Sequence, residues 1–241
     1  MTVLNVKEVF PTIQGEGPLA GVPAVFVRLA GCNLRCWFCD TDFDGGEPWT
    51  ATQLMREVHQ QGQYIGARPH KGLLAADPAP SPRPLVVLTG GEPLAQPIAD
   101  LVWSAIRDGW RVQIETAGTL WTHLPESEHL DIVCSPKTPK LHPKARERVT
   151  AWKYLVRVTD RCDDDGLPIS STQDPERAGT GVPSKDSKLP LAKPNPGAPV
   201  YLQPVQEPGD PNNANTSEAV RRSMRFGYLL SLQQHKVVGL P

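Results

Sequence analysis

The chain has 241 residues, and its charges nearly cancel, with 25 Lys and Arg residues against 26 Asp and Glu residues. A chain of this length fits one α/β domain covering residues 1–241, and the balanced charge gives no indication of a nucleic-acid partner. No apolar run approaches the roughly 18 residues of a membrane-spanning helix, and residues 1–7 lack the basic and apolar regions of a secretory signal. We therefore expect a soluble, cytoplasmic protein that binds neither nucleic acid nor membrane.

The hydrophobic pattern alternates between strands and helices along the chain. Strand-like segments occur at residues 3–9, 24–29, 85–88, 111–115, 130–134, 152–156, 199–203 and 227–232. Helical patterns occur at residues 50–61, 98–106 and 215–226. Thr50 and Gln53 form a capping box for the first helix, and Asn215 is predicted to cap the last. The alternation favours a mostly parallel sheet with about six strands in βα units, fewer than the eight of a closed barrel.

Two long stretches interrupt this pattern. Residues 66–84 are rich in Ala, Pro and Gly, and residues 159–199 are rich in Asp, Ser, Pro, Lys and Gly. Loops of this length are uncommon in compact domains unless they are functional or disordered. We interpret both as loop insertions rather than domains, and we expect the second to be mobile at least in part.

Three of the five cysteines fall within eight residues, which does not fit the disulfide framework of a secreted protein. They are Cys32, Cys36 and Cys39, in the spacing C-x3-C-x2-C. Buried free thiols are one alternative. A zinc site is another, but the candidate fourth ligands His59, Cys134 and Asp40 are not at a usual finger spacing. Three close thiolates after a strand better fit a four-iron cluster that leaves one iron without a protein ligand.

This cysteine spacing resembles that of the radical S-adenosylmethionine enzymes. The resemblance implies an incomplete (β/α)6-type barrel, a 4Fe-4S cluster, and S-adenosylmethionine bound to the open iron and cleaved to a 5′-deoxyadenosyl radical. The segment Thr89-Gly-Gly-Glu-Pro93 follows a strand and matches the family's motif for the cofactor's amino group. The cofactor-binding residues that the resemblance implies are Phe38, Gly90, Gly91, Glu92, Glu115, Thr116, Ser135, Lys137 and Gln203.

Within that superfamily, the chain resembles the 7-carboxy-7-deazaguanine synthase family over most of its length. The segments that carry the resemblance are 10–17, 25–32, 39–43, 114–118, 134–137 and 232–241. That family contracts the ring of 6-carboxy-5,6,7,8-tetrahydropterin to 7-carboxy-7-deazaguanine and releases ammonia, on the route to queuosine and other deazapurines. The implied substrate-binding residues are Ile13, Gln14, Gly15, Glu16, Arg28, Thr89, His235 and Pro241.

The resemblance also implies a Mg²⁺ ion at Thr41, with Asp40 just outside the metal ligands. It implies an electron donor such as flavodoxin or ferredoxin, and a homodimer. Cys134 and Cys162 are expected to be spectators, because Cys134 lies in an apolar strand and Cys162 lies in an Asp-rich loop. Two other functions stay open at this stage: an activase that makes a glycyl radical on a partner protein, and a non-enzymatic zinc module.

Overall fold

The computed structural model describes residues 2–36, 39, 41–66, 84–169, 191–206 and 213–240. The strands in these residues are β1 (Val3–Ile13), β2 (Pro23–Leu29), β3 (Glu47–Thr50), β4 (Leu85–Gly90), β5 (Arg111–Thr116), β6 (Leu130–Cys134), β7 (Ala151–Val156), β8 (Val200–Pro204) and β9 (Leu229–Leu230). The helices are α1 (Ala51–Gly62), α2 (Ala99–Arg107), α3 (Pro143–Arg148), α4 (Ala214–Phe226) and α5 (Gln234–Val237). Short 3-10 turns lie at η1 (Gly17–Leu19), η2 (Gln63–Ile65) and η3 (Pro93–Ala95).

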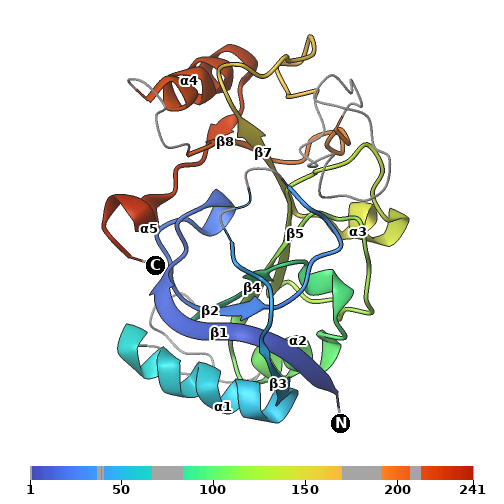
Figure 1. The fold of residues 1–241 in the computed structure, drawn as a ribbon, viewed down its shortest axis with the longest axis vertical. Coiled ribbons are helices and arrows are strands. Elements are labelled where there is room, and N and C mark those ends of the chain that lie inside the picture. Colours follow the sequence, from blue (N-terminus) through green and yellow to red (C-terminus); the bar gives the residue numbers. More distant parts are fainter. Residues whose placement is uncertain are drawn as a thin grey trace.

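The described strands form one sheet in the order β3-β1-β2-β4-β5-β6-β7-β8-β9. β1 is antiparallel to β2 and β3, and every neighbouring pair from β2 to β9 is parallel. The sheet curves from β1 and β2 through β5 to β7 and β8, and α1 and α2 lie on its outer side (Figure 1). It stays open because β3 and β9 lie at its two ends. The predicted α/β fold with an open, mostly parallel sheet is therefore confirmed.

Several elements differ from the sequence prediction. β3 was not predicted, because Pro48 weakens the strand pattern; the strand lies at the sheet edge, where proline is tolerated. β9 is shorter than the predicted strand 227–232, because Gly227 closes α4 with φ 76°. α3 and α5 were also not predicted, and the connection 117–129 between β5 and β6 contains no helix.

The predicted cap of the last helix was wrong. The residue that precedes α4 is Asn213, with φ 55°, and Asn215 lies inside the helix. The Asn215 side chain instead accepts from the Val158 backbone N–H (2.9 Å) and donates to the Val205 carbonyl (2.9 Å). The amide of Asn215 therefore connects the segments that follow β7 and β8. These tertiary contacts use the side-chain groups that would otherwise cap the helix.

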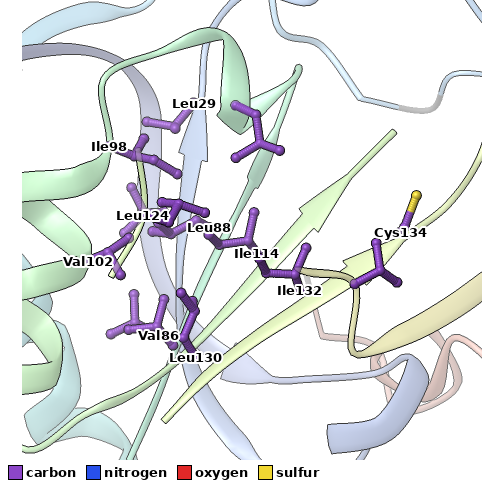
Figure 2. Close-up of a cluster of buried hydrophobic side chains, with 14 of the residues drawn as sticks. Leu29, Val86, Leu88, Ile98, Val102, Ile114, Leu124, Leu130, Ile132 and Cys134 are labelled. Carbon is purple, nitrogen blue, oxygen red and sulfur yellow. The ribbon is translucent and has the colours of Figure 1, made fainter. Parts of the chain in front are cut away.

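Successive side chains of the parallel strands point to opposite faces of the sheet. The outward set forms the main buried core against α1 and α2. Figure 2 shows Leu88 of β4, Ile114 of β5 and Ile132 of β6 in a row, with Val102 of α2 nearest to Leu88. Full burial of such a side chain stabilises the fold by about 1.5–3 kcal/mol. This outer layer therefore holds the strands in register.

The inward side chains change character along the strands. Ala24, Leu85 and Val87 form a small apolar cluster at the amino ends. Polar side chains follow toward the carboxyl ends of β2, β4, β5, β7 and β8: Arg28, Thr89, Glu115, Lys153 and Gln203. The polar end of the interior is therefore the place for a ligand site, as in other open α/β sheets. No helix in the described residues combines the length and the apolar character needed to cross a membrane.

The capping box of α1 gives a test of the helix boundary. Thr50 Oγ1 accepts from Gln53 N–H (3.3 Å), and Thr50 N–H donates to Gln53 Oε1 (2.8 Å). Thr50→Ala should lower the free energy of unfolding by about 1 kcal/mol, because a helix N–H loses its partner. Urea denaturation measures this change. Thr52→Ala, in the same turn but exposed, is the matched control, and equal stability of the two variants would contradict the prediction.

Candidate active site

A cavity of about 490 Å³ opens at the carboxyl ends of the parallel strands. Its walls come from the ends of β2, β4, β5, β7 and β8, from the loops after β1, β2 and β6, and from residues 233–240. Segments that are distant in the sequence therefore meet around one space.

Most of the predicted site residues line this cavity. Those predicted to bind substrate are Gln14, Glu16, Arg28, Thr89 and His235. Those predicted to bind the cofactor are Gly90, Gly91, Glu92, Glu115, Thr116, Ser135, Lys137 and Gln203. Those predicted to bind metal are Cys32, Cys36, Cys39 and Thr41. The fold thus gathers the residues that the sequence analysis grouped, while their roles remain proposals.

A few predicted residues are placed differently. Ile13 and Gly15 are not among the cavity-lining residues. A Cβ at Gly15 would lie only 1.9 Å from His235 Nδ1, and the Gly15 carbonyl accepts from the Gln234 N–H (3.1 Å). Gly15 is therefore needed for the close packing of the C-terminal segment. Phe38, Asp40 and Pro241 lie outside the described residues.

The three clustered cysteines open onto the same cavity. Their segment is closed by a bond from the Gly31 N–H to the Phe43 carbonyl (2.8 Å). Burial raises the pKa of Cys32 to about 11, and a bound metal cation would favour its thiolate form. Among the described residues, no three Cys, His, Asp or Glu side chains converge as ligands of a single ion do. The site thus presents three thiols to one cavity, and thiolates are the ligands that iron–sulfur clusters take.

The Thr89–Pro93 segment packs directly on the start of the cysteine loop. The Gly91 N–H donates to the Leu29 carbonyl (3.0 Å), and the Glu92 N–H donates to the Gly31 carbonyl (2.9 Å). A Cβ at Gly91 would lie 1.8 Å from the Gly31 carbonyl oxygen. Glycine at position 91 is therefore required by the contact between two protein segments, whether or not a ligand also approaches it.

Glu92 is bound by the protein itself. Its side chain is fully enclosed, and Oε1 accepts from the Leu94 N–H (3.0 Å) and from Thr116 Oγ1 (2.7 Å). Oε2 accepts from the Ala117 N–H (2.8 Å). Burial raises the pKa of this carboxyl in spite of these bonds. Much of its acceptor capacity thus joins the end of β4 to the end of β5, and less remains for a cofactor amino group than the sequence suggested.

A buried charge cluster forms another wall of the site. Lys153 of β7 donates to Glu115 Oε2 of β5 (2.7 Å) and to Glu16 Oε2 in the loop after β1. Gln233 Nε2 donates to Glu16 Oε1 (2.7 Å). Burial acts to raise the pKa of Glu16, but Lys153, Gln233 and His235 outweigh it and lower the pKa to about 2. Glu16 is therefore a carboxylate at neutral pH.

Lys153 and Gln233 were missed by the sequence analysis. Lys153 is a single cation in the otherwise apolar strand Ala151–Val156, and its side chain is only 7% exposed. Since a lysine is almost never buried without a partner, its place in that strand was a signal for a polar interior. Gln233 had no comparable signal, because its contact with Glu16 depends on how the C-terminal segment folds back.

Arg28 and Lys137 also have partners within the protein. Arg28 Nε lies 2.9 Å from Glu8 Oε1, and its guanidinium lies 5.5 Å from the centre of the Phe10 ring. Lys137 Nζ donates to the Ser135 carbonyl (2.8 Å) and to its hydroxyl. Burial lowers the pKa of Lys137, and the nearby Cys36 opposes that effect. These contacts fix both cations at the cavity wall.

The remaining cysteines lie away from the cavity. Cys134 belongs to the main apolar core, and burial raises its pKa to about 12. Cys162 is exposed. Neither residue is among those that line the cavity, and their role as spectators stays a prediction.

The chain has clear relatives. The family model of the Radical SAM superfamily matches residues 27–170. A 7-carboxy-7-deazaguanine synthase of Rhodospirillum rubrum is 43% identical over 98% of this chain and 92% of its own length. Another protein of that name, from Rickettsia prowazekii, is 34% identical over 99% of this chain and 89% of its own. The crystal structure of QueE from Escherichia coli shares the fold, with a TM-score of 0.63 and 24% identity over 95% of this chain and 93% of that one.

The Gly91 contact predicts a specific defect. Gly91→Ala should lower the iron content after anaerobic reconstitution severalfold, because the new Cβ displaces the start of the cysteine loop. Iron analysis and the visible absorption spectrum measure this loss. Thr52→Ala is the control, because Thr52 is exposed on α1 and is not among the residues that line the cavity. A Gly91→Ala protein with full iron content would show that the loop tolerates the displacement.

Proposed function

The chain belongs to the 7-carboxy-7-deazaguanine synthase family of radical S-adenosylmethionine enzymes, and we propose that it contracts 6-carboxy-5,6,7,8-tetrahydropterin to 7-carboxy-7-deazaguanine with loss of ammonia. One observation carries the proposal: the clustered cysteines, the Thr89–Pro93 segment and the loop of Gln14 and Glu16 line a single cavity. The relatives give no support to a glycyl-radical activase or to a zinc module.

The cluster and S-adenosylmethionine, when bound, would supply radical chemistry at the substrate. Cys32, Cys36 and Cys39 would hold the cluster. The residues at the ends of β4, β5, β6 and β8 would bind the cofactor: Gly90, Gly91, Glu92, Glu115, Thr116, Ser135, Lys137 and Gln203. The protein's remaining task is to orient the substrate and to exclude water.

Other residues that line the cavity offer groups that match a carboxylated pterin. Glu16 is ionised and can accept from the paired N–H groups of the pterin's guanidine-like edge, with charge-assisted bonds. Gln14, Thr89 and His235 add polar contacts on the same side. Arg28 can bind the substrate carboxylate through its guanidinium, which would then share that cation with Glu8.

Thr41 would bind Mg²⁺ beside the substrate carboxylate. Thr41 lines the cavity two residues after Cys39, and Mg²⁺ accepts a single hydroxyl ligand because it keeps several of its own waters. A flavodoxin or ferredoxin would deliver the electron, and the protein would act as a homodimer, as the family resemblance implies.

Anaerobic incubation with reductant, S-adenosylmethionine and 6-carboxy-5,6,7,8-tetrahydropterin should yield a product with the mass of 7-carboxy-7-deazaguanine. Cys32→Ala, Cys36→Ala or Cys39→Ala should abolish the product and lower the iron content, because three thiolates are the minimum for an open-site cluster. Cys162→Ala is the matched control and should retain both, since Cys162 is exposed and outside the cavity. Cofactor cleavage without product from the wild-type protein would overturn the substrate assignment and leave the radical chemistry intact.

Turnover should depend on Mg²⁺ through Thr41. Removal of divalent cations by a chelator should slow product formation, and added Mg²⁺ should restore it. Thr41→Ala should raise the Mg²⁺ concentration needed for half-maximal rate about tenfold, because loss of one oxygen ligand weakens the coordination by about 1.4 kcal/mol. Thr52→Ala, far from the cavity, should titrate like the wild type. Full activity of the wild-type enzyme in metal-free buffer would exclude the ion.

A further inference from the structure

Lys153 connects two parts of the cavity that the proposed function assigns to different ligands. Its ammonium lies between Glu16, on the substrate side, and Glu115, on the cofactor side. All three side chains are at most 15% exposed. Gln14 Nε2 and Gln113 Nε2 also donate to Glu115 Oε1 (3.3 Å and 2.5 Å), so that carboxylate is held from three directions.

The energetics of burial explain why the three charges occur together. A lone buried ammonium is strongly disfavoured, and two adjacent carboxylates without a cation repel each other. Burial acts to lower the pKa of Lys153, but Glu115 and Glu16 outweigh it and keep the pKa above its usual value. The two carboxylates therefore compensate the burial of the Lys153 ammonium.

We propose that Lys153 is a positioning residue, which is anchored on Glu115 and holds the Glu16 carboxylate in place and charged for the substrate. The inference rests on the proposed function for the identity of the substrate, and on the three-way contact for the role of Lys153. Lys153 itself acts through Glu16, because its donors already face the two carboxylates.

Two other basic side chains face this cluster. His235 faces Glu16 from the C-terminal segment and favours its ionised form, and Lys137 faces Lys153 from the loop after β6. Without Lys153, burial would raise the pKa of Glu16. The carboxylate, and the substrate affinity that depends on it, would then be retained at high pH and lost as the pH falls through the raised pKa.

Two measurements on cluster-loaded protein test the proposal. The first follows the Glu16 carboxyl by ¹³C NMR of Glu-labelled protein without substrate, with the signal assigned from Glu16→Gln. In wild-type protein the signal should stay at the ionised position from pH 8 to pH 6, and in Lys153→Met it should move toward the protonated position. The second measures the Kd of 6-carboxy-5,6,7,8-tetrahydropterin by anaerobic calorimetry with S-adenosylmethionine and no reductant, at the same two pH values.

The ratio of the pterin Kd of Lys153→Met to that of wild type should be about tenfold larger at pH 6 than at pH 8. One pKa unit corresponds to a tenfold change in the equilibrium between the two protonation states. Lys153→Arg, which keeps the charge, should recover the wild-type pH dependence. Lys144→Met, an exposed lysine of α3, is the matched control. In a double-mutant cycle, Lys153→Met should have little effect on the Kd of the pterin in a Glu16→Gln background, because the carboxylate through which Lys153 acts on the substrate is already absent.

An unmoved Glu16 signal in Lys153→Met would overturn the proposal, and so would an equal loss of affinity at both pH values that persists in the Glu16→Gln background. If Lys153→Met does not fold, Lys153→Gln, which keeps a hydrogen-bond donor but removes the charge, takes its place in both measurements. If wild-type protein does not bind the pterin, the proposed function fails, while the NMR measurement still decides the role of Lys153.

Discussion

The contact of Lys153 with Glu16 and Glu115 is the interaction on which the arrangement of the site depends. It joins the loop after β1, the end of β5 and the middle of β7, which no local sequence contact would bring together. Because the buried ammonium of Lys153 contacts both carboxylates, the cluster ties the loop after β1 to the parallel strands β5 and β7. The same carboxylate of Glu16 receives Gln233, so the position of the C-terminal segment follows from it as well.

A second constraint fixes the distance between the cysteine loop and the cofactor wall. Backbone bonds from Gly91 and Glu92 to Leu29 and Gly31 leave no space for a side chain at position 91. Glu92 then links this segment to Thr116 at the next strand. The Thr89–Pro93 segment, which resembles a cofactor-binding motif, thus also holds the cysteine loop in place. Substitutions in this segment would displace the cysteine loop as well as change ligand contacts.

Much of this arrangement could be predicted from the sequence, for reasons that are local. The strand of Leu85–Gly90 is a short apolar run that ends in glycines, and the capping box at Thr50 is a local pattern. The predictions that failed concern residues whose contacts are distant in the sequence. Asn215 was predicted as a helix cap, but its side chain is used by two distant loops. Lys153 was not predicted as a site residue, because it is recognised only through its contact with Glu16, which is 137 residues away in the chain.

The two ends of the chain close the cavity with polar contacts rather than with apolar packing. The Gly17 N–H donates to Ser231 Oγ (2.9 Å) and the Gln234 N–H to the Gly15 carbonyl (3.1 Å), while Val237 of α5 is 77% exposed. Hydrogen bonds of this kind contribute about 0.5–1.5 kcal/mol each, less than one buried Leu or Ile of the outer core. Local opening therefore costs least at this wall, and most at the sheet between β2 and β7. The charge cluster connects this wall to the sheet. Glu16 belongs to the loop after β1, which is held mainly by hydrogen bonds, and Lys153 belongs to strand β7 of the sheet.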